Sequence, residues 1–483
     1  MKSDFNVAVI GAGPAGIAAG HELIAQGFDN FTVFDKSDAA GGTWHIHSYP
    51  GLDCDLWAHP YTFSYRPNPD WGSNFASRAE IEAYLQSCAT EFGLDPHFRF
   101  NTNIVSARFM PNKTWLLTDQ HGEQHQFNAV INAMGNQHTA IYPDVEGIES
   151  FGGDSWHSTF WQHDVDLEGK RVVVVGSAAA GVQIVPEVAK LAAQLTVLQR
   201  TPNWIMRRNR KQYSPFALAV FKYCPPLLRL YRSSLSLLAG VVLEGVTLGH
   251  QRMQQFEDRV HKFIGESITD PELRKSVTPN SRYGCKRGLM SDDFYPALNM
   301  EHVELVPEGL KAVRPHGITT SSGREIDADI IIYCTGYRIL DFDRIAITGL
   351  QQKQLDAEMD KAPIAYKGIT VPSFPNLFFA AGPNGLAINA SYFTNVELNI
   401  HSIVNLLAQM RERSVQAITV KPEINAAYNE SLADDYAKYS WGHSSCNSYY
   451  RNEAGHAPFL FPGGIKRYRE LHASCSIKDF DAV

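Results

Sequence analysis

The sequence predicts an α/β protein made of two doubly wound, Rossmann-like dinucleotide-binding domains with a helical insertion. Two apolar runs, Val7-Ala8-Val9-Ile10 and Val172-Val173-Val174-Val175, each lead directly into a glycine-rich loop. A helical stretch and a second apolar strand follow each loop, which is the βαβ arrangement of nucleotide-binding folds. The length of 483 residues is sufficient for two or three domains with cores of their own.

The first loop, Gly11-Ala12-Gly13-Pro14-Ala15-Gly16, has the complete glycine pattern of a dinucleotide site. Gly11 suits a tight turn, Gly13 allows the backbone to approach a pyrophosphate, and Gly16 allows close packing of helix on strand. The phosphates are expected at the helix N-terminus, where unbonded N–H groups favour anions. Asp35 follows the strand at 31–34 and can accept hydrogen bonds from a ribose diol, which predicts FAD or NAD.

The second loop runs from Gly176 to Gly181 and has Ala178 in place of the middle glycine. The strand after it, 195–198, is followed by Arg200 and Thr201 instead of an acidic residue. A carboxylate there would repel a 2′-phosphate, whereas a guanidinium and a hydroxyl would bind it. The second site is therefore predicted to prefer NADPH.

Two further strands are expected to connect the domains. The segment 329–337 reads as a strand that ends at Gly336 near the cofactor of the first domain, and 130–135 is its earlier counterpart. We interpret both as crossing points between a discontinuous domain and a domain inserted in it. The predicted division is 1–140 and 330–483 for the FAD-binding domain, 150–210 and 280–329 for the NADP-binding domain, and 211–279 for the helical insertion.

Composition excludes several classes of function. The net charge of −8 argues against a general nucleic-acid surface. The first residues lead straight into a strand, so no signal peptide is expected. The seven cysteines form no C-x-x-C pair, which predicts a cytoplasmic protein with neither a metal site nor a redox dithiol.

Residues 215–248 are the only segment that suggests a membrane. Their apolar runs are interrupted by Lys222, Arg229, Arg232 and Glu244, so no transmembrane helix is expected. Packed helices of an inserted subdomain are favoured, with a membrane-facing surface as the alternative. The sequence leaves the oligomeric state open.

Between the two loops lies a pattern formed by Phe151, Gly153, His157 and Trp161. It resembles the fingerprint of the type I Baeyer–Villiger monooxygenases, with Gln162 as a departure at its end. Further family-like segments are Gly41-Gly42-Thr43-Trp44 with Asp55, Gln199-Arg200-Thr201-Pro202-Asn203-Trp204, and 444–464 with Cys446, Tyr449 and Tyr450. Within the family, 76–100 is most similar to the 4-hydroxyacetophenone monooxygenase branch. Disulfide reductases of related architecture require a redox cysteine pair, which the spacing does not predict.

The resemblance implies that FAD, NADPH and O2 convert a ketone into an ester or lactone through a peroxide at the flavin C4a. The resemblance to this family also implies that Arg287 supplies a fixed positive charge beside the flavin and that Asp55 positions this arginine. Arginine suits the role of Arg287 because its guanidinium stays charged when desolvated. Lys286 is expected to join Arg200 on the 2′-phosphate.

The resemblance also assigns supporting residues. Gly42 and Trp44 are expected at the cofactor, and Asn384 is expected to open a helix whose N-terminus faces the flavin. His157 is expected to couple the domains instead of transferring a proton. Asp53 stands where relatives often have arginine, with an effect that the sequence does not define.

Two alternatives remain from the sequence. One is an N- or S-oxygenating flavin-containing monooxygenase, and the other is a flavin protein or NADPH oxidase without an organic substrate. The sequence does not identify the ketone, although the branch resemblance points to aryl ketones.

Overall fold

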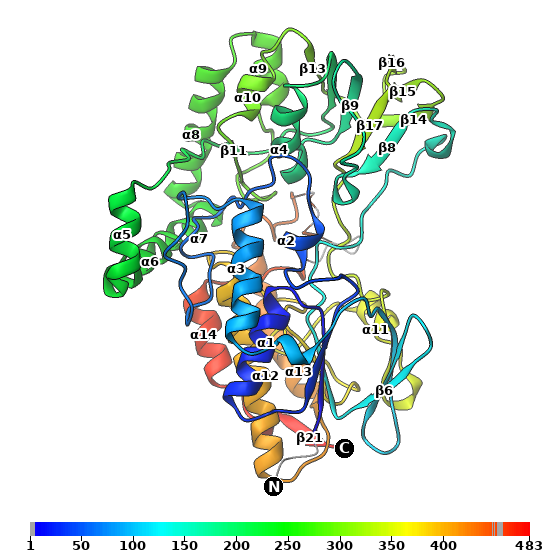
Figure 1. Cartoon of the computed structure of the whole chain (residues 1–483), viewed down its shortest axis with the longest axis vertical. Coiled ribbons are helices and arrows are strands. Elements are labelled where there is room, and N and C mark those ends of the chain that lie inside the picture. Colours follow the sequence, from blue (N-terminus) through cyan, green and yellow to red (C-terminus); the bar gives the residue numbers. More distant parts are fainter. Residues whose placement is uncertain (1–4, 447, 449, 452–456) are drawn as a thin grey trace.

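The computed structural model describes residues 5–446, 448, 450–451 and 457–483, which form two lobes along the long axis of the molecule (Figure 1). Each lobe is built around a five-stranded parallel sheet. The first lobe is the lower one in Figure 1, and the helices of the insertion project from the side of the molecule. The predicted fold class, two Rossmann-like units with a helical insertion, is confirmed.

The sheet of the first lobe has the order β19-β7-β1-β2-β3. Its strands are β1 (Val7–Ile10), β2 (Phe31–Phe34), β3 (Phe98–Arg99), β7 (Ala129–Asn132) and β19 (Leu377–Phe379). All four residues of β1 are buried, because a parallel sheet is covered on both faces, and this explains the uninterrupted apolar run.

The sheet of the second lobe has the order β13-β10-β9-β17-β8. Its strands are β8 (Asp154–His157), β9 (Arg171–Val175), β10 (Gln194–Leu198), β13 (Val303–Val306) and β17 (Ile330–Tyr333). The central three strands, β10-β9-β17, repeat the arrangement of β2-β1-β7 in the first lobe. In both, the glycine loop follows the middle strand.

The two glycine turns have the same geometry. Gly11 has a φ of +112°, and a Cβ on it would lie 2.5 Å from the carbonyl oxygen of Ala133, just after β7. Gly176 has a φ of +105°, and its Cβ would lie 2.6 Å from the carbonyl oxygen of Cys334, just after β17. Only glycine fits such a turn without strain, so the turns set where the following helices begin.

Antiparallel sheets flank the parallel ones. The first lobe has β18-β4-β5-β6 and the second has β14-β15-β16. Their strands are β4 (Ile104–Phe109), β5 (Trp115–Asp119), β6 (Gln124–Phe127), β18 (Ala346–Thr348), β14 (Leu310–Arg314), β15 (Gly317–Thr320) and β16 (Glu325–Asp327). Two smaller pairs are β11 (Ile205–Met206) with β12 (Leu289–Met290), and β20 (Ile418–Val420) with β21 (Phe480–Ala482).

Helices cover the sheets of both lobes. In the first lobe they are α1 (Pro14–Ala25), α2 (Thr43–Ile46), α3 (Arg78–Glu91), α11 (Leu355–Lys361), α12 (Tyr392–Glu412), α13 (Pro422–Tyr436) and α14 (Ile465–Ala473). In the second they are α4 (Ala179–Val188) and α10 (Phe294–Ala297). Short 3-10 helices are η1 (Asp95–His97), η2 (Ile148–Ser150), η3 (Ser158–Phe160), η4 (Leu350–Gln352) and η5 (Ile477–Asp479).

The insertion is helical, with α5 (Pro215–Tyr223), α6 (Pro225–Leu238), α7 (Gly240–Val246), α8 (Gln251–Ser267) and α9 (Pro271–Val277). Among the described residues, the stretch 225–246 is long and apolar enough to cross a membrane by length and composition, and 11% of its most apolar window is buried. The insertion packs on the second lobe through α8.

One predicted boundary differs from the structure. The sequence interpretation begins the second part of the FAD-binding domain at residue 330, but β17 pairs with β9 and β8 in the sheet of the second lobe. The reason is that the apolar run 330–333 completes the parallel sheet next to the second glycine loop. The chain therefore crosses to the first lobe after β17.

The close packing of α1 on β1 predicts that a methyl group added at Gly16 destabilises the protein. A Cβ on Gly16 would lie 1.8 Å from the carbonyl oxygen of Gly11. Gly16→Ala should therefore lower the free energy of unfolding by about 2 kcal/mol or more, because backbone has to move. Chemical denaturation of wild type and variant measures this difference in the free energy of unfolding. Gly265→Ala is the matched control, since its Cβ would meet nothing within 4 Å in helix α8; equal stability of the two variants would contradict the packing argument.

Candidate active site

A cavity of about 440 Å³ lies where the two glycine loops meet. Gly13 and Ala15 of the first loop and Ala179 and Ala180 of the second all line it. Within the described part of the chain no side chain caps the N-terminus of α1 or of α4. Two helix N-termini with unbonded N–H groups therefore face one cavity, and each suits a phosphate group.

The first-lobe side of the cavity fits FAD. A Cβ on Gly13 would sit 3.4 Å from the Cα of Gly42, in a cradle that both glycines leave open. Asp35 lines the cavity, and its carboxylate accepts hydrogen bonds from the backbone N–H groups of Ala12 (2.6 Å) and Ser37 (2.8 Å). These bonds fix the carboxylate at the end of β2 and leave lone pairs for ribose hydroxyls.

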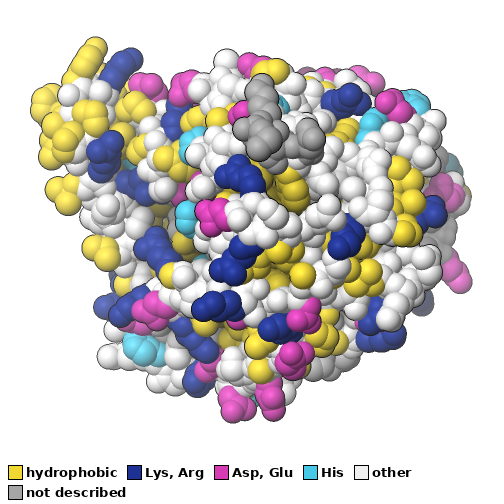
Figure 2. All heavy atoms as spheres, turned by 90° about the horizontal axis from the view of Figure 1, so that it is seen from below, with side chains coloured by type: hydrophobic (Ala, Val, Ile, Leu, Met, Phe, Trp, Pro, Cys, Tyr) yellow, Lys and Arg dark blue, Asp and Glu magenta, His cyan; other side chains and the backbone are white. Residues whose placement is uncertain are grey.

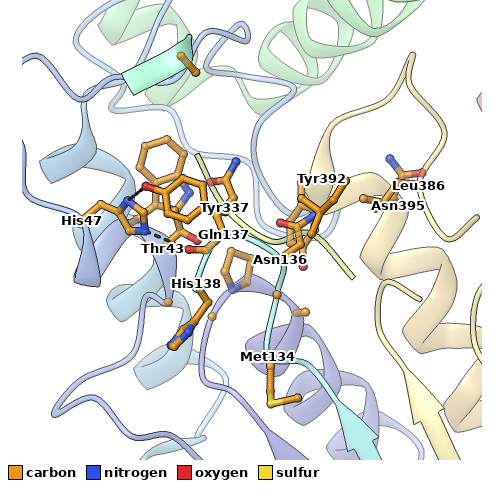
Figure 3. A pocket seen from close by; sticks show the side chains of 18 of the residues that line it. Thr43, His47, Met134, Asn136, Gln137, His138, Tyr337, Leu386, Tyr392 and Asn395 are labelled. Carbon is orange, nitrogen blue, oxygen red and sulfur yellow. Dashed lines mark hydrogen bonds between the residues drawn. The ribbon is translucent and has the colours of Figure 1, made fainter. Parts of the chain in front are cut away.

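Trp44 forms part of the same wall. Its ring is 8% exposed, and Nε1 donates a hydrogen bond to the hydroxyl of Tyr61 at 3.1 Å. The wall opposite is made by the C-terminal part of the chain. Figure 3 shows His47, Gln137 and Tyr337 on one side of the cavity and Leu386, Tyr392 and Asn395 on the other.

The cationic residues predicted for the second nucleotide lie together. The Lys286 ammonium donates a hydrogen bond to the hydroxyl of Thr201 at 2.7 Å. Burial and the positive charge of Arg200 lower the pKa of Lys286, which places Arg200 within electrostatic reach. Two positive charges and a hydroxyl gathered at the end of β10 form an anion site.

Arg287 and Asp55 are in contact. The Arg287 Nη2 donates to Asp55 Oδ1 at 2.5 Å, and both residues line the cavity. The Asp55 side chain is 15% exposed and that of Arg287 is 42% exposed. Asp55 comes from the first lobe, and Arg287 follows the insertion, so the ion pair also joins distant parts of the chain.

Cys285, close to this arginine in the sequence, forms a disulfide that the sequence analysis did not predict. Cys285, two residues before Arg287, is bonded to Cys446 across 161 residues of sequence. A local spacing motif cannot reveal a pair so far apart. The bond ties the Lys286-Arg287 segment to the C-terminal segment beside the cavity, where Tyr450 also lines the wall. The predicted absence of a redox-active C-x-x-C pair is a different matter, because these two cysteines are distant in sequence.

Asp53 has two arginine partners. Its carboxylate lies 2.9 Å from Arg208 and 2.6 Å from Arg210. Burial raises the pKa of Asp53, and the two arginines oppose this rise. The departure noted in the sequence thus places a negative charge between two positive ones that come from the segment just before the insertion.

Gln183 of α4 connects the lobes. Its side chain accepts from the hydroxyl of Tyr49 (3.1 Å) and donates to the carbonyl of Asp53 (2.8 Å). A Cβ on Gly51 would lie 2.5 Å from the backbone carbonyl of Gln183. The segment 49–53 of the first lobe therefore packs closely on the helix that begins at the second glycine loop.

A chain of hydrogen bonds runs from the predicted fingerprint to the first lobe. The Thr159 hydroxyl donates to the hydroxyl of Tyr337 (2.9 Å), which in turn lies 3.2 Å from His47 Nδ1. His47 Nε2 lies 3.1 Å from the carbonyl oxygen of Gln137 (Figure 3). Since a carbonyl only accepts, Nε2 carries the proton and Nδ1 accepts from Tyr337.

Both histidines of this network are neutral at physiological pH. Burial lowers the pKa of His47 to about 4, opposed by its bond to Gln137. Burial also lowers the pKa of His157 to about 4, opposed by a backbone hydrogen bond to Gly336. The backbone N–H of Thr159 donates to His157 Nδ1 at 3.2 Å. His157 thus holds Thr159 in place.

The other fingerprint residues are also packed elements. A Cβ on Gly153 would lie 2.2 Å from the carbonyl oxygen of Asp329, and Phe151 packs on the core of the second lobe. Trp161 stacks edge to face on Trp156 with ring centroids 5.5 Å apart.

The structure brings some of the predicted site residues to the cavity; Arg200, Thr201, Gly336 and Asn384 are not among the residues that line it. Those that line the cavity are Gly11, Gly13, Asp35, Gly42, Trp44, Asp55, Lys286 and Arg287. Gly16, Gly176 and Gly181 are helix and turn positions behind the loops. Asn384 is buried with a φ of +58°, and Tyr436 donates a hydrogen bond to it. The helix expected there, α12, begins at Tyr392, so Ala390, Tyr392 and Asn395 meet the cavity instead. Tyr449 lies outside the described residues.

The sequence interpretation missed His47, Gln137, Thr159, Gln183 and Tyr337 as site residues. The only available signals were the position of Thr159 inside the fingerprint and of Tyr337 directly after Gly336.

Comparisons with known proteins agree with this geometry. A family model described as flavin-binding monooxygenase-like matches residues 4–354. A Pseudomonas aeruginosa protein named Baeyer–Villiger monooxygenase is 38% identical over 99% of this chain and 90% of its own length.

Solved structures share the fold. The closed crystal structure of a cyclohexanone monooxygenase has a TM-score of 0.88 at 25% identity, with 100% of both chains covered. An oxidized steroid monooxygenase bound to NADP has a TM-score of 0.86 at 25% identity, with 99% of both chains covered.

The hydrogen-bond chain predicts the effect of removing one hydroxyl. Tyr337→Phe keeps the ring but loses the bonds to Thr159 and His47, so the free energy of unfolding should fall by about 1–3 kcal/mol. Thermal and chemical unfolding measure the change. Tyr223→Phe is the control, because the Tyr223 side chain is 81% exposed. If both variants had the same free energy of unfolding, the hydrogen bonds of Tyr337 would not contribute to holding the lobes together.

Proposed function

Because the chain belongs to the flavin-binding monooxygenase-like family, we propose that it is a Baeyer–Villiger monooxygenase which uses FAD, NADPH and O2 to convert ketones into esters or lactones. The observation that carries the proposal is the Arg287–Asp55 pair on a cavity that both glycine loops face. Such a cavity suits two dinucleotides, and a cation beside it suits oxygen chemistry that develops negative charge.

The first lobe holds FAD in this proposal. The N-terminus of α1 binds the pyrophosphate, Asp35 binds the ribose, and Gly13 and Gly42 leave room for the cofactor backbone. FAD, once reduced by NADPH, supplies the activation of O2. The protein's share is to orient the reactants and to limit access of water.

Arg287 acts on the reacting atoms. Its guanidinium stays protonated in a pocket of any polarity, and Asp55 fixes its direction. A positive charge held in this way stabilises negative charge on oxygen, both before attack on the ketone carbonyl and on the carbonyl oxygen during it. Arg287 is therefore the catalytic residue, and Asp55 is its positioning residue.

NADPH binds to the second lobe. The N-terminus of α4 faces its pyrophosphate, and Arg200, Thr201 and Lys286 bind the 2′-phosphate. The hydrogen bonds of Gln183 to Asp53 and of Thr159 to Tyr337 keep the two nucleotide sites in register.

Replacing the catalytic arginine tests the proposal. Arg287→Ala should lower kcat/KM for a ketone by about 100-fold or more, because the charge that stabilises the reacting oxygen is lost. Anaerobic reduction of the bound flavin by NADPH should change little. Arg324→Ala is the control, because Arg324 pairs with Glu304 and neither residue lines the cavity.

The products decide between the candidate reactions. A purified yellow protein that forms esters from a ketone panel, with NADPH consumption raised by the ketone, supports the proposal. Formation of only sulfoxides or N-oxides, unchanged in Arg287→Ala, would instead identify a heteroatom monooxygenase.

The 2′-phosphate site predicts cofactor preference. Arg200→Gln removes one charge-assisted hydrogen bond, so KM for NADPH should rise about 10- to 100-fold. KM for NADH should stay the same, since NADH has no 2′-phosphate. Steady-state kinetics with both cofactors measure the ratio, and Arg324→Gln, whose side chain pairs with Glu304, is the control. An equal rise for NADH would assign Arg200 a different role.

A further inference from the structure

The hairpin of α5 and α6, residues 215–238, exposes an unusual amount of apolar surface. Six of the fifteen large hydrophobic side chains exposed in the described part of the chain belong to it. They are Phe216 (79% exposed), Tyr223 (81%), Leu227 (48%), Leu230 (65%), Leu237 (80%) and Leu238 (50%). The hairpin forms the left edge of the molecule in Figure 2, where yellow side chains gather with dark-blue ones between them.

The four leucines share one face of α6. At helical spacing, Leu227, Leu230, Leu237 and Leu238 fall on one side of α6. The other side of α6 packs inward, where Leu228 is 4% exposed. A helix that is packed on one side and apolar on its outer side has a surface left for a partner.

The inner face is firmly attached to the first lobe. Arg232 donates to the carbonyl of Thr62 at 3.2 Å. The rings of Phe221 and Tyr231 stack at 5.4 Å, and His59 lies against Phe221 at 4.8 Å. The hairpin therefore presents its leucines in a fixed direction.

The hairpin carries a net positive charge, whereas the whole chain is negatively charged. Residues 212–243 contain Lys222, Arg229 and Arg232 but no aspartate or glutamate, whereas the whole chain has a net charge of −8. Lys222 is 57% exposed and lies 3.9 Å from the carboxylate of Asp70, and Arg229 is also exposed. An exposed apolar face with basic side chains at its border is typical of helices that lie in the interface of an anionic membrane.

We propose that the α5–α6 hairpin docks on the surface of an anionic lipid bilayer. A second copy of the chain fits this face less well, because a symmetric contact would bring Arg229 of both copies together, and the hairpin itself has no acidic residue to pair with them. A membrane-spanning arrangement conflicts with the packing. Arg232 ties α6 to the first lobe, and a Cβ on Gly245 would lie 2.1 Å from the Phe256 ring, so α7 is pressed against α8.

The hairpin leads to the active-site cavity. Helix α7 follows α6 directly, and its residues Val242 and Val246 line the cavity. A ketone dissolved in the bilayer would thus reach the cavity along an apolar helix. This part of the inference, which rests on the proposed function, identifies the substrates as lipophilic ketones that partition into membranes.

Vesicle binding tests the docking without any catalysis. The full protein is sedimented with phosphatidylcholine vesicles that contain or lack phosphatidylserine. Wild type should bind the anionic vesicles and be released by high salt or alkaline carbonate. Leu230→Ser/Leu237→Ser should weaken this binding about tenfold or more, because two exposed leucines no longer enter the interface. Leu191→Ser, at a position 51% exposed on the second lobe, is the matched control and should bind like wild type.

The same variants test whether ketones reach the active-site cavity from the bilayer. Turnover of a water-soluble ketone should be equal in wild type and the double leucine variant, while turnover of a long-chain ketone held in anionic vesicles should fall with vesicle binding. Absence of wild-type binding, resistance to carbonate, or a change of oligomeric mass in the double variant with unchanged vesicle binding would each overturn the docking proposal. Vesicle binding by a protein that oxygenates no ketone would instead overturn the proposed function alone.

Discussion

The site depends on two glycine turns that press against the carbonyl ends of neighbouring strands. A Cβ on Gly11 would lie 2.5 Å from the carbonyl oxygen of Ala133, and a Cβ on Gly176 would lie 2.6 Å from that of Cys334. These turns direct the N-termini of α1 and α4 into one cavity, where no described side chain caps them. Two anion-binding helix ends at one place are what a pair of dinucleotides requires if electrons are to pass between them.

The lobes must also keep their relative position, and polar side chains do this. Gln183 bonds to the segment 49–53, Tyr337 bonds to His47, and Asp55 bonds to Arg287. The bonds of Gln183 and Arg287 run from the second lobe to the first, and Tyr337 receives its link to the second lobe from Thr159. Because burial keeps His47 neutral, the hydrogen-bond direction through Tyr337 is defined at physiological pH. The fingerprint acts through this network, since His157 positions Thr159, and Thr159 bonds to Tyr337.

Local patterns made the two Rossmann units predictable, because glycine spacing and apolar runs act over a few residues. The ends of β2 and β10 likewise identified Asp35 and Arg200 by chemistry alone. Arg287 and Asp55 followed only from family resemblance, since 232 residues separate them. The Cys285–Cys446 bond, the partners of Asp53 and the true place of Asn384 depend on tertiary packing that no spacing encodes. The strand at 330–333 shows the same limit, because an apolar run does not say which sheet it joins.

The most direct test of the central claim uses isotopically labelled O2 with purified protein, NADPH and a ketone that it turns over. The account predicts that the ester or lactone gains a single labelled oxygen between the former carbonyl carbon and its neighbour, with equal amounts of NADPH consumed and ester formed. Label found only in hydrogen peroxide and water, with the ketone recovered unchanged, would contradict it.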